Sequence, residues 1–143
     1  MTVKAILSTK GYSVVTIRPG TTLADAAQVL AKHRIGAVIV AAADGRLAGM
    51  LSERDIVRAL AERGAAALEL KVDDVMTRKV VTCTEADTVG ALMEQMTNGK
   101  FRHVPVLDGE RLTGVISIGD VVKYRLGEVE AESNAMRDYI LTA

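Results

Sequence analysis

Residues 46–58 read RLAGMLSERDIVR, and residues 111–123 read RLTGVISIGDVVK. Six of these thirteen aligned positions are identical, at a constant offset of 65 residues. Weaker matches continue upstream, where Val14-Val15-Thr16 recurs as Val80-Val81-Thr82 at an offset of 66. Ordered matches at a fixed period indicate an internal repeat. We therefore expect two copies of one supersecondary unit.

Each copy predicts the element order β-α-β-β-α. In the first copy we expect strands over 14–17, 37–40 and 47–51 and helices over 23–35 and 53–63. In the second copy we expect strands around Thr82, over 104–106 and over 112–116, and helices over 89–96 and from Ser117 onward. Thr22, followed by Asp25, predicts a capped start for the first helix, and Gly36 predicts its end.

The two copies are expected to pack sheet against sheet, because one unit of this size buries little apolar surface alone. The result is an α/β (α+β) fold with pseudo-two-fold symmetry. We place the first repeat at 3–64, a helical connector at 65–71, the second repeat at 72–128 and a C-terminal helix or tail at 129–143.

The C-terminal segment carries an apolar stripe at helical spacing, formed by Val129, Met136, Tyr139 and Ile140. Such a stripe predicts either a helix that covers the module's own edge or a dimerisation helix. The spacing of the residues does not separate these two interpretations.

The composition disfavours nucleic acid and membrane partners. The 18 basic residues cancel the 18 acidic ones, and only 3% of residues are aromatic, so neither phosphate clamps nor stacking platforms are expected. The longest apolar run, residues 37–43, is too short to span a bilayer, and no secretory signal is visible. The single cysteine, Cys83, fits a reducing cytoplasm and is expected to be a buried apolar residue.

Each repeat places a serine and an aspartate at the junction of a strand with a helix, as Ser52 with Asp55 and Ser117 with Asp120. This spacing predicts a capping box, which needs no ligand. The same geometry also favours an anion, because free helix N–H groups and the helix dipole attract phosphate. Arg54 adds a cation in the first copy, where the second copy has a glycine, so the two sites are expected to differ in charge.

No set of residues for metal binding or catalysis emerges. His33 and His103 lie far apart in the sequence, and no cysteine or carboxylate stands near either at ligand spacing. The sequence contains no nucleophile elbow and no dinucleotide-binding glycine motif. We therefore expect no enzyme activity and no metal site.

With these features the chain resembles a tandem pair of CBS (cystathionine β-synthase-type) domains, a stand-alone Bateman module. The resemblance covers residues 3–128. It rests on the duplicated threonine strands, the two Gly-x-x-Ser-x-x-Asp junctions, the segment Phe101-Arg102-His103-Val104-Pro105-Val106 and the lead-in Val72-Asp73-Asp74-Val75-Met76-Thr77.

The resemblance implies a non-catalytic regulatory module that binds an adenosine-containing ligand in the cleft between the repeats. Such ligands include AMP, ADP, ATP, S-adenosylmethionine and NAD or NADH, so the module would sense energy or redox state and signal to a separate protein. By analogy, the ribose hydroxyls bind Asp55 and Asp120. The phosphate-binding residues are Ser52, Arg54, Ser117, Arg102 and His103. The adenine lies against Thr16, Thr82 and the backbone around Val38 and Val104.

The first repeat departs from this pattern, because it has Gly36-Ala37 where the second has Arg102-His103. Small residues widen a pocket, so we expect the first site to admit a larger ligand, with Lys10 reaching its phosphate. The resemblance also implies a homodimer, since the family commonly forms a flat disc. The alternative is a structural or interaction scaffold with vestigial pockets, in which both Ser–Asp pairs act only as caps.

Overall fold

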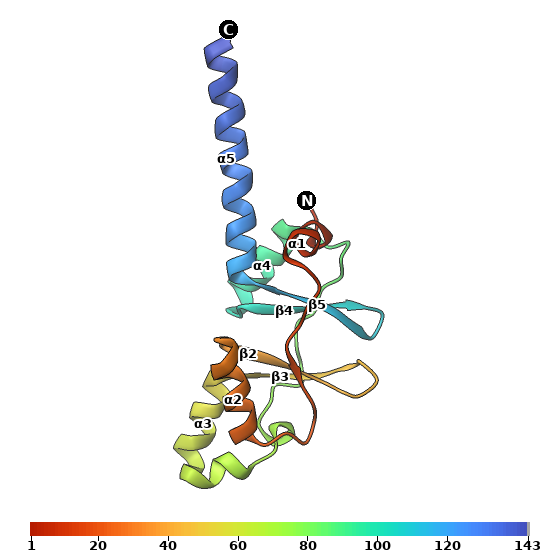
Figure 1. Ribbon diagram of the computed structural model, residues 1–143, viewed down its shortest axis with the longest axis vertical. Helices are drawn as coiled ribbons and strands as arrows, with labels where there is room; N and C mark the ends of the chain where they lie inside the picture. The colour runs from red at the N-terminus through yellow and green to blue at the C-terminus, as the bar shows by residue number, and fades with distance from the viewer. Residues whose placement is uncertain (143) are drawn as a thin grey trace.

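The computed structural model describes residues 1–142 of the 143-residue chain. The helices are α1 (Val3–Lys10), α2 (Leu23–His33), α3 (Glu53–Arg63), α4 (Val89–Gly99) and α5 (Ile118–Thr142). The strands are β1 (Thr16–Ile17), β2 (Ala37–Ala41), β3 (Leu47–Ser52), β4 (His103–Asp108) and β5 (Arg111–Ser117). Figure 1 shows the strands in two central layers, with α2 and α3 on one side, α1 and α4 on the other, and α5 projecting from the body.

The strands form two small sheets. In the first, β1 pairs parallel with β2, and β2 pairs antiparallel with β3; in the second, β4 pairs antiparallel with β5. The sheets touch at their hairpin turns, where the Leu112 N–H donates to the Gly45 carbonyl over 3.1 Å. This arrangement confirms the predicted mixed α/β fold built from two related units.

Two predicted boundaries in the repeats are wrong. The first long helix ends at His33 because Arg34 takes a left-handed conformation with φ 54°, before the predicted stop at Gly36. Thr82 lies outside any strand, and the expected pairing shrinks to a single bridge between Cys83 and Val106. Pro105 explains this loss, because a proline has no N–H with which to extend the ladder toward Thr82.

The connector between the repeats is helical, as predicted, but has 3₁₀ geometry. It comprises η1 (Gly64–Glu69), and a second short 3₁₀ turn, η2 (Val72–Asp74), opens the lead-in to the second repeat.

Cys83 is buried as expected, with 4% of its surface exposed. Burial and the charge of Asp87 raise the pKa of its thiol to about 12, so the sulfur stays protonated.

The apolar cores do not follow the order of the chain. The core around α2, α3 and β2 contains Val72 and Met76, from the segment that leads into the second repeat. The core around α4, β4 and β5 contains the buried face of α1, formed by Val3, Ile6 and Leu7. Each repeat is therefore completed by the lead-in segment of the other.

Matching backbone hydrogen bonds hold the two exchanged lead-ins. At α4, the Val3 N–H donates to the Asp87 carbonyl over 2.9 Å, and the Val89 N–H donates to Met1 over 2.9 Å. At α2, the Leu23 N–H donates to the Leu70 carbonyl over 2.9 Å, and the Val72 N–H donates to Thr21 over 2.8 Å. The two lead-in segments therefore dock through equivalent backbone hydrogen bonds, so the internal repeat includes them as well.

The repeated glycine of each junction lies where a lead-in crosses the sheet. A Cβ on Gly49 would lie 2.7 Å from the Thr77 carbonyl oxygen and 2.8 Å from the Met76 sulfur. A Cβ on Gly114 would lie 3.0 Å from a methyl group of Leu7. Glycine is thus required at Gly49 because the lead-in backbone approaches too closely for any side chain.

The last helix runs without a break through the predicted boundary at residue 129. The stripe residues Val129, Met136, Tyr139 and Ile140 are 47%, 63%, 72% and 67% exposed. The interpretation of this stripe as a cover for the module's own edge is therefore wrong.

Among residues 1–142, no helix combines the length and the apolar character needed to cross a membrane.

Replacing Gly49 with alanine tests the close approach of the lead-in. We expect Gly49→Ala to lower the free energy of unfolding by about 1–3 kcal/mol, because the methyl group overlaps backbone that cannot move away easily. Gly90→Ala is the matched control, since Gly90 lies in α4 with open space around its Cα. In urea denaturation, the free energy of unfolding of Gly90→Ala should be at least as high as that of the wild type. Equal stability of the two variants would contradict this packing.

Candidate functional site

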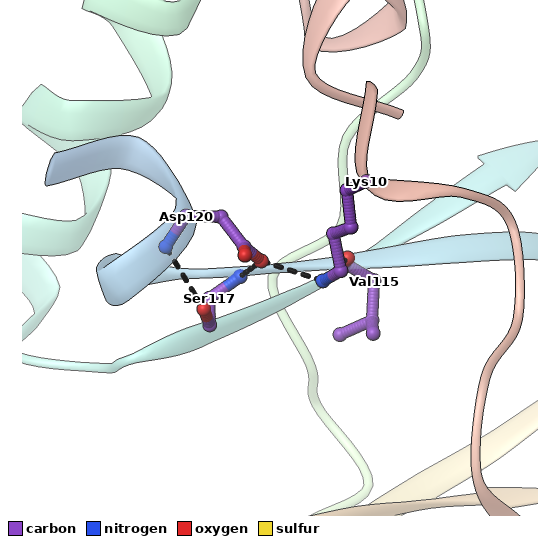
Figure 2. A network of polar contacts seen from close by, with 4 residues as sticks. All are labelled: Lys10, Val115, Ser117 and Asp120. Carbon is purple, nitrogen blue, oxygen red and sulfur yellow. Dashed lines mark hydrogen bonds and ion pairs between the residues drawn. The ribbon is translucent and has the colours of Figure 1, made fainter. Parts of the chain in front are cut away.

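The second junction forms a closed capping box at the start of α5. The Asp120 N–H donates to the Ser117 hydroxyl oxygen over 3.1 Å, and the Ser117 N–H donates to Asp120 Oδ2 over 2.9 Å. Figure 2 shows both bonds at the point where β5 passes into the helix. The local sequence produces this geometry because a serine cap and a carboxylate at the third helical position satisfy each other's neighbouring N–H groups.

A lysine from the opposite end of the sequence joins this box. The Lys10 ammonium lies 2.5 Å from Asp120 Oδ2 and donates to the Val115 carbonyl over 2.6 Å (Figure 2). Lys10 reaches the site because it ends α1, which packs in the second core. We predicted that Lys10 would reach the first site, and the structure places its ammonium at the second.

The position of Lys10 breaks the symmetry of the repeat. Val115 corresponds to Met50 in the first repeat, and the Met50 carbonyl accepts a hydrogen bond from the Thr77 N–H over 2.9 Å. At the second junction an ammonium takes the place of that backbone donor. The second site therefore carries a positive charge that the first lacks at this position.

Strand β4 brings two more of the predicted residues to the second junction. His103 stands opposite Ser117 in the antiparallel ladder, and the Ile118 N–H donates to the Arg102 carbonyl over 2.8 Å. Arg102 is exposed, and His103 is half-buried. Burial lowers the pKa of His103, and the positive charges of Lys10 and Arg102 lower it further against the opposing effect of Asp120.

The Asp120 carboxylate remains ionised at neutral pH. Burial by itself raises its pKa, but hydrogen bonds from Lys10 and Ser117 outweigh burial and hold the pKa below its usual value. With His103 neutral, the Lys10 ammonium pairs with this carboxylate, and the charge of Arg102 acts on the neighbouring His103. Within residues 1–142, the second carboxylate oxygen, Oδ1, accepts no hydrogen bond. The site thus offers excess positive charge beside a free acceptor.

The first junction repeats the box with different electrostatics. The Ser52 N–H donates to Asp55 Oδ2 over 2.9 Å, and the Asp55 N–H donates to the Ser52 hydroxyl oxygen over 3.3 Å. The other oxygen, Asp55 Oδ1, lies 3.5 Å from a guanidinium nitrogen of Arg58. Only 8% of the Asp55 side chain is exposed, against 23% for Asp120. Both oxygens of Asp55 are therefore already engaged.

The surroundings of Asp55 balance in charge. Arg54 is exposed on α3. A cavity of about 580 Å³ beside Asp55 has walls of both signs, lined by Arg58, Glu62, Arg63 and Asp74. Strand β2 contributes no ring nitrogen here, because Ala37 holds the place opposite Ser52 that His103 holds opposite Ser117.

The remaining predicted site residues lie on the strands and their approaches. The side chains of Val38 and Val104 are buried in the two cores, so only their backbones can border a ligand. Thr16 is exposed on β1, and Thr82 is half-buried ahead of the Cys83 bridge. Within residues 1–142, neither threonine hydroxyl forms a hydrogen bond to a junction.

Sequence reasoning missed two groups at the junctions. Arg58 stands three residues after Asp55 on one helix, a spacing that does predict an ion pair. The Val115 carbonyl carries no sequence signal, because its role depends on where Lys10 arrives.

In the part of the chain that the structure describes, no three His, Cys, Asp or Glu side chains cluster closely enough to hold a metal ion.

Two related α/β repeats that exchange their lead-in segments, each with a capped Ser–Asp junction, define a tandem-repeat module. The chain belongs to the CBS domain family, whose model matches residues 3–62 and 72–127. The pairing of two such repeats agrees with the resemblance that the junction motifs indicate.

Solved structures and a curated relative support this assignment. The chain is similar to the CBS-domain containing protein ATU1752 from Agrobacterium tumefaciens, with 50% identity, a TM-score of 0.83 and coverage of 87% of this chain and 99% of that one. It is similar to the CBS domain protein PAE2072 from Pyrobaculum aerophilum complexed with AMP, with 30% identity, a TM-score of 0.74 and coverage of 84% and 89%. The mitochondrial CBS domain-containing protein CBSX3 of Arabidopsis thaliana is 31% identical, over 97% of this chain and 71% of the relative.

The lowered pKa of His103 predicts a component of acid sensitivity. An unfolded histidine binds a proton below about pH 6.5, whereas folded His103 resists protonation, so its contribution to stability is lost as pH falls below that value. We expect His103→Asn to flatten the loss of unfolding free energy between about pH 7 and pH 5. His33→Asn is the control, because His33 is exposed at the end of α2. Identical pH profiles for wild type and His103→Asn would contradict the described surroundings of the ring.

Proposed function

We propose that this protein is a non-catalytic regulatory module that binds an adenine nucleotide, with the second junction as its principal site. The observation that carries the proposal is the Lys10–Asp120 ion pair at the N-terminal end of α5, where the first residue of the helix also bonds the Arg102 carbonyl. A nucleotide presents both a phosphate and a ribose diol. This junction offers cations for the first and a carboxylate acceptor for the second.

The ribose and phosphate use different parts of the site. Asp120 Oδ1 is free to accept a hydrogen bond from a ribose hydroxyl, while Oδ2 keeps the capping bond to Ser117. A phosphate near the start of α5 gains from the helix dipole and from charge-assisted bonds with Lys10 and Arg102. The backbone around Val104 and the Thr16 and Thr82 side chains are the proposed border of the adenine. The ligands that fit this scheme are AMP, ATP and NAD or NADH.

A similar protein supports the ligand class. The structure from Pyrobaculum aerophilum contains AMP, and its chain is 30% identical to this one over most of both lengths. AMP carries both groups that the second junction is suited to bind. The choice among adenine nucleotides rests on the cations, because Lys10 and Arg102 together favour ligands with more phosphate charge.

The first junction is the weaker site in this proposal. Asp55 already uses both oxygens, in the capping box and in the ion pair with Arg58. Arg54 remains available to a phosphate, but a ribose diol would have to displace Arg58 from Asp55. The expected larger ligand at this junction was to meet Lys10 at its phosphate, but the Lys10 ammonium lies at the other junction.

The regulatory output follows from the position of Asp120 in the first turn of α5. A ligand that binds one arrangement of this helix better than another shifts the population between them. In our proposal the protein acts as a homodimer in the cytoplasm and passes this shift to a separate protein target. No chemical step on the nucleotide is part of the scheme.

A scaffold without a ligand is the second candidate function. Both serine–aspartate boxes are complete within the chain, so capping alone accounts for these residues. In that case the module would serve only to hold its partners, and the excess charge of Lys10 and Arg102 would have no ligand.

Calorimetric titration with AMP, ATP, NAD and NADH separates the two functions. We expect micromolar binding of at least one nucleotide, about −8 kcal/mol, and its loss in Asp120→Asn. Asparagine keeps a capping oxygen, so a change in binding without a change in thermal unfolding identifies a ligand contact. If none of the four nucleotides binds to protein that is folded and ligand-free, the result would favour the scaffold.

Lys10→Met tests the role of charge at the same site. We expect the affinity for a phosphate-bearing nucleotide to fall about tenfold or more, equivalent to about 1.4 kcal/mol, because methionine keeps the apolar stem and removes the ammonium. Lys4→Met is the matched control, since Lys4 is exposed on the same helix. Equal affinities for wild type and Lys10→Met would remove Lys10 from the site.

A further inference from the structure

The exposed side of α5 carries an apolar seam with the spacing of a coiled coil. Six positions alternate by four and three residues along the helix: Val122, Leu126, Val129, Ser133, Met136 and Ile140. The five apolar members are between 47% and 67% exposed. In heptad terms the seam places Leu126, Ser133 and Ile140 at a positions, and Val122, Val129 and Met136 at d positions.

The body of the protein leaves this seam free. Val121 and Tyr124, which pack into the second core, occupy c and f positions of the same heptad. These positions lie on the opposite side of a helix from a and d, since each residue advances the helix by about 100°. Figure 1 shows the outer half of α5 extending clear of the sheets and of the other helices. A second helix can therefore lie along the outer part of the seam without meeting the body.

We propose that a second copy of this chain covers the seam, so that two α5 helices form a parallel, in-register coiled coil. The inference does not rest on nucleotide binding. It identifies the contact surface and the orientation of the partner, both of which the resemblance to disc-forming proteins leaves open.

The charges beside the seam select the parallel orientation. In a parallel pair, a g residue of one helix meets the e residue five positions later on the other. This rule places Arg125 against Glu130 of the second copy and Glu132 against Arg137 of the second copy. By two-fold symmetry each contact occurs twice, and every one joins opposite charges.

The antiparallel alternative brings like charges together. When the same six seam positions overlap in opposite directions, Glu130 meets Glu130 and Glu132 meets Glu132 of the second copy, while Lys123 meets Arg137. Like charges at these positions repel, so the flanking sequence opposes this arrangement. Ser133 is the one polar seam position, and in the parallel pair it faces its own counterpart.

A parallel pair fixes the placement of the two bodies. The two-fold axis runs along the seam, and both second repeats lie at the same end of the coiled coil because α5 begins in the second repeat. The two Lys10–Asp120 junctions then lie at the same end of the coiled coil, each on the side of its α5 helix away from the seam because Asp120 occupies a b position. Each stands at the first turn of a helix that contributes to the dimer contact.

Sedimentation of the full chain over a range of concentrations tests the contact. We expect a dimer in the wild type and at least a tenfold weaker dimer in a Val129→Lys, Met136→Lys variant. Both residues are exposed within one chain, so circular dichroism should show an intact body. A wild type that is monomeric at every concentration, or a variant that dimerises as tightly as the wild type, overturns the proposal.

Disulfide trapping tests the orientation. Ser133→Cys should give a covalent dimer under mild oxidation, because the two a positions face each other only in the parallel, in-register pair. Ala135→Cys is the control on the outer side of the helix and should stay unlinked, while the native Cys83 is buried. Failure of Ser133→Cys to cross-link in a dimeric sample, or equal cross-linking of both variants, overturns the parallel arrangement.

The charge swap gives a second readout that does not involve a thiol. Arg137→Glu places two acidic groups together at Glu132 and should weaken the dimer. Adding Glu132→Arg to the same chain restores opposite charges and should recover the wild-type affinity. No recovery in the double variant contradicts the predicted pairing.

Discussion

Each apolar core of this protein is closed by the lead-in segment of the other repeat. Leu7 enters the second core, and Met76 enters the first. Apolar burial supplies most of the stabilisation in a small domain, so neither repeat is complete without the other's lead-in. The close passage of these segments also explains the glycine that begins each junction motif. The two repeats consequently behave as one structural unit.

The same exchange makes two nearly identical junctions chemically different. Both have a complete Ser–Asp capping box with closely similar bond lengths. Lys10 arrives at the second box on the exchanged helix, whereas Asp55 in the first pairs with Arg58 from its own helix. One carboxylate is thereby left partly accessible beside an excess of positive charge, and the other is neutralised locally. The difference in proposed ligand binding follows from these two cations.

The sequence predicts features that depend on near neighbours. The spacing of Ser52 and Asp55 identifies the cap of α3, and the strands predicted over 37–40 and 47–51 are the paired β2 and β3. Contacts between distant segments carry no comparable signal, so the assignment of Lys10 to the first site was wrong. The repeat suggested full symmetry and so predicted a strand at Thr82. Pro105 limits pairing there, and the structure has a single bridge at Cys83 instead. Gly36 suggested a later helix end, but Arg34 adopts the left-handed conformation first.

The topology also sets an order of events during synthesis. The first core lacks Met76 until the ribosome has moved well past the first repeat, and it can close soon afterwards. The second core needs residues as late as Val121, so α1 has no apolar surface to join for most of translation. An eight-residue helix is too short to persist alone in water. Helix α1 precedes both repeats in the chain, yet its apolar partners are complete only when the second repeat is nearly finished.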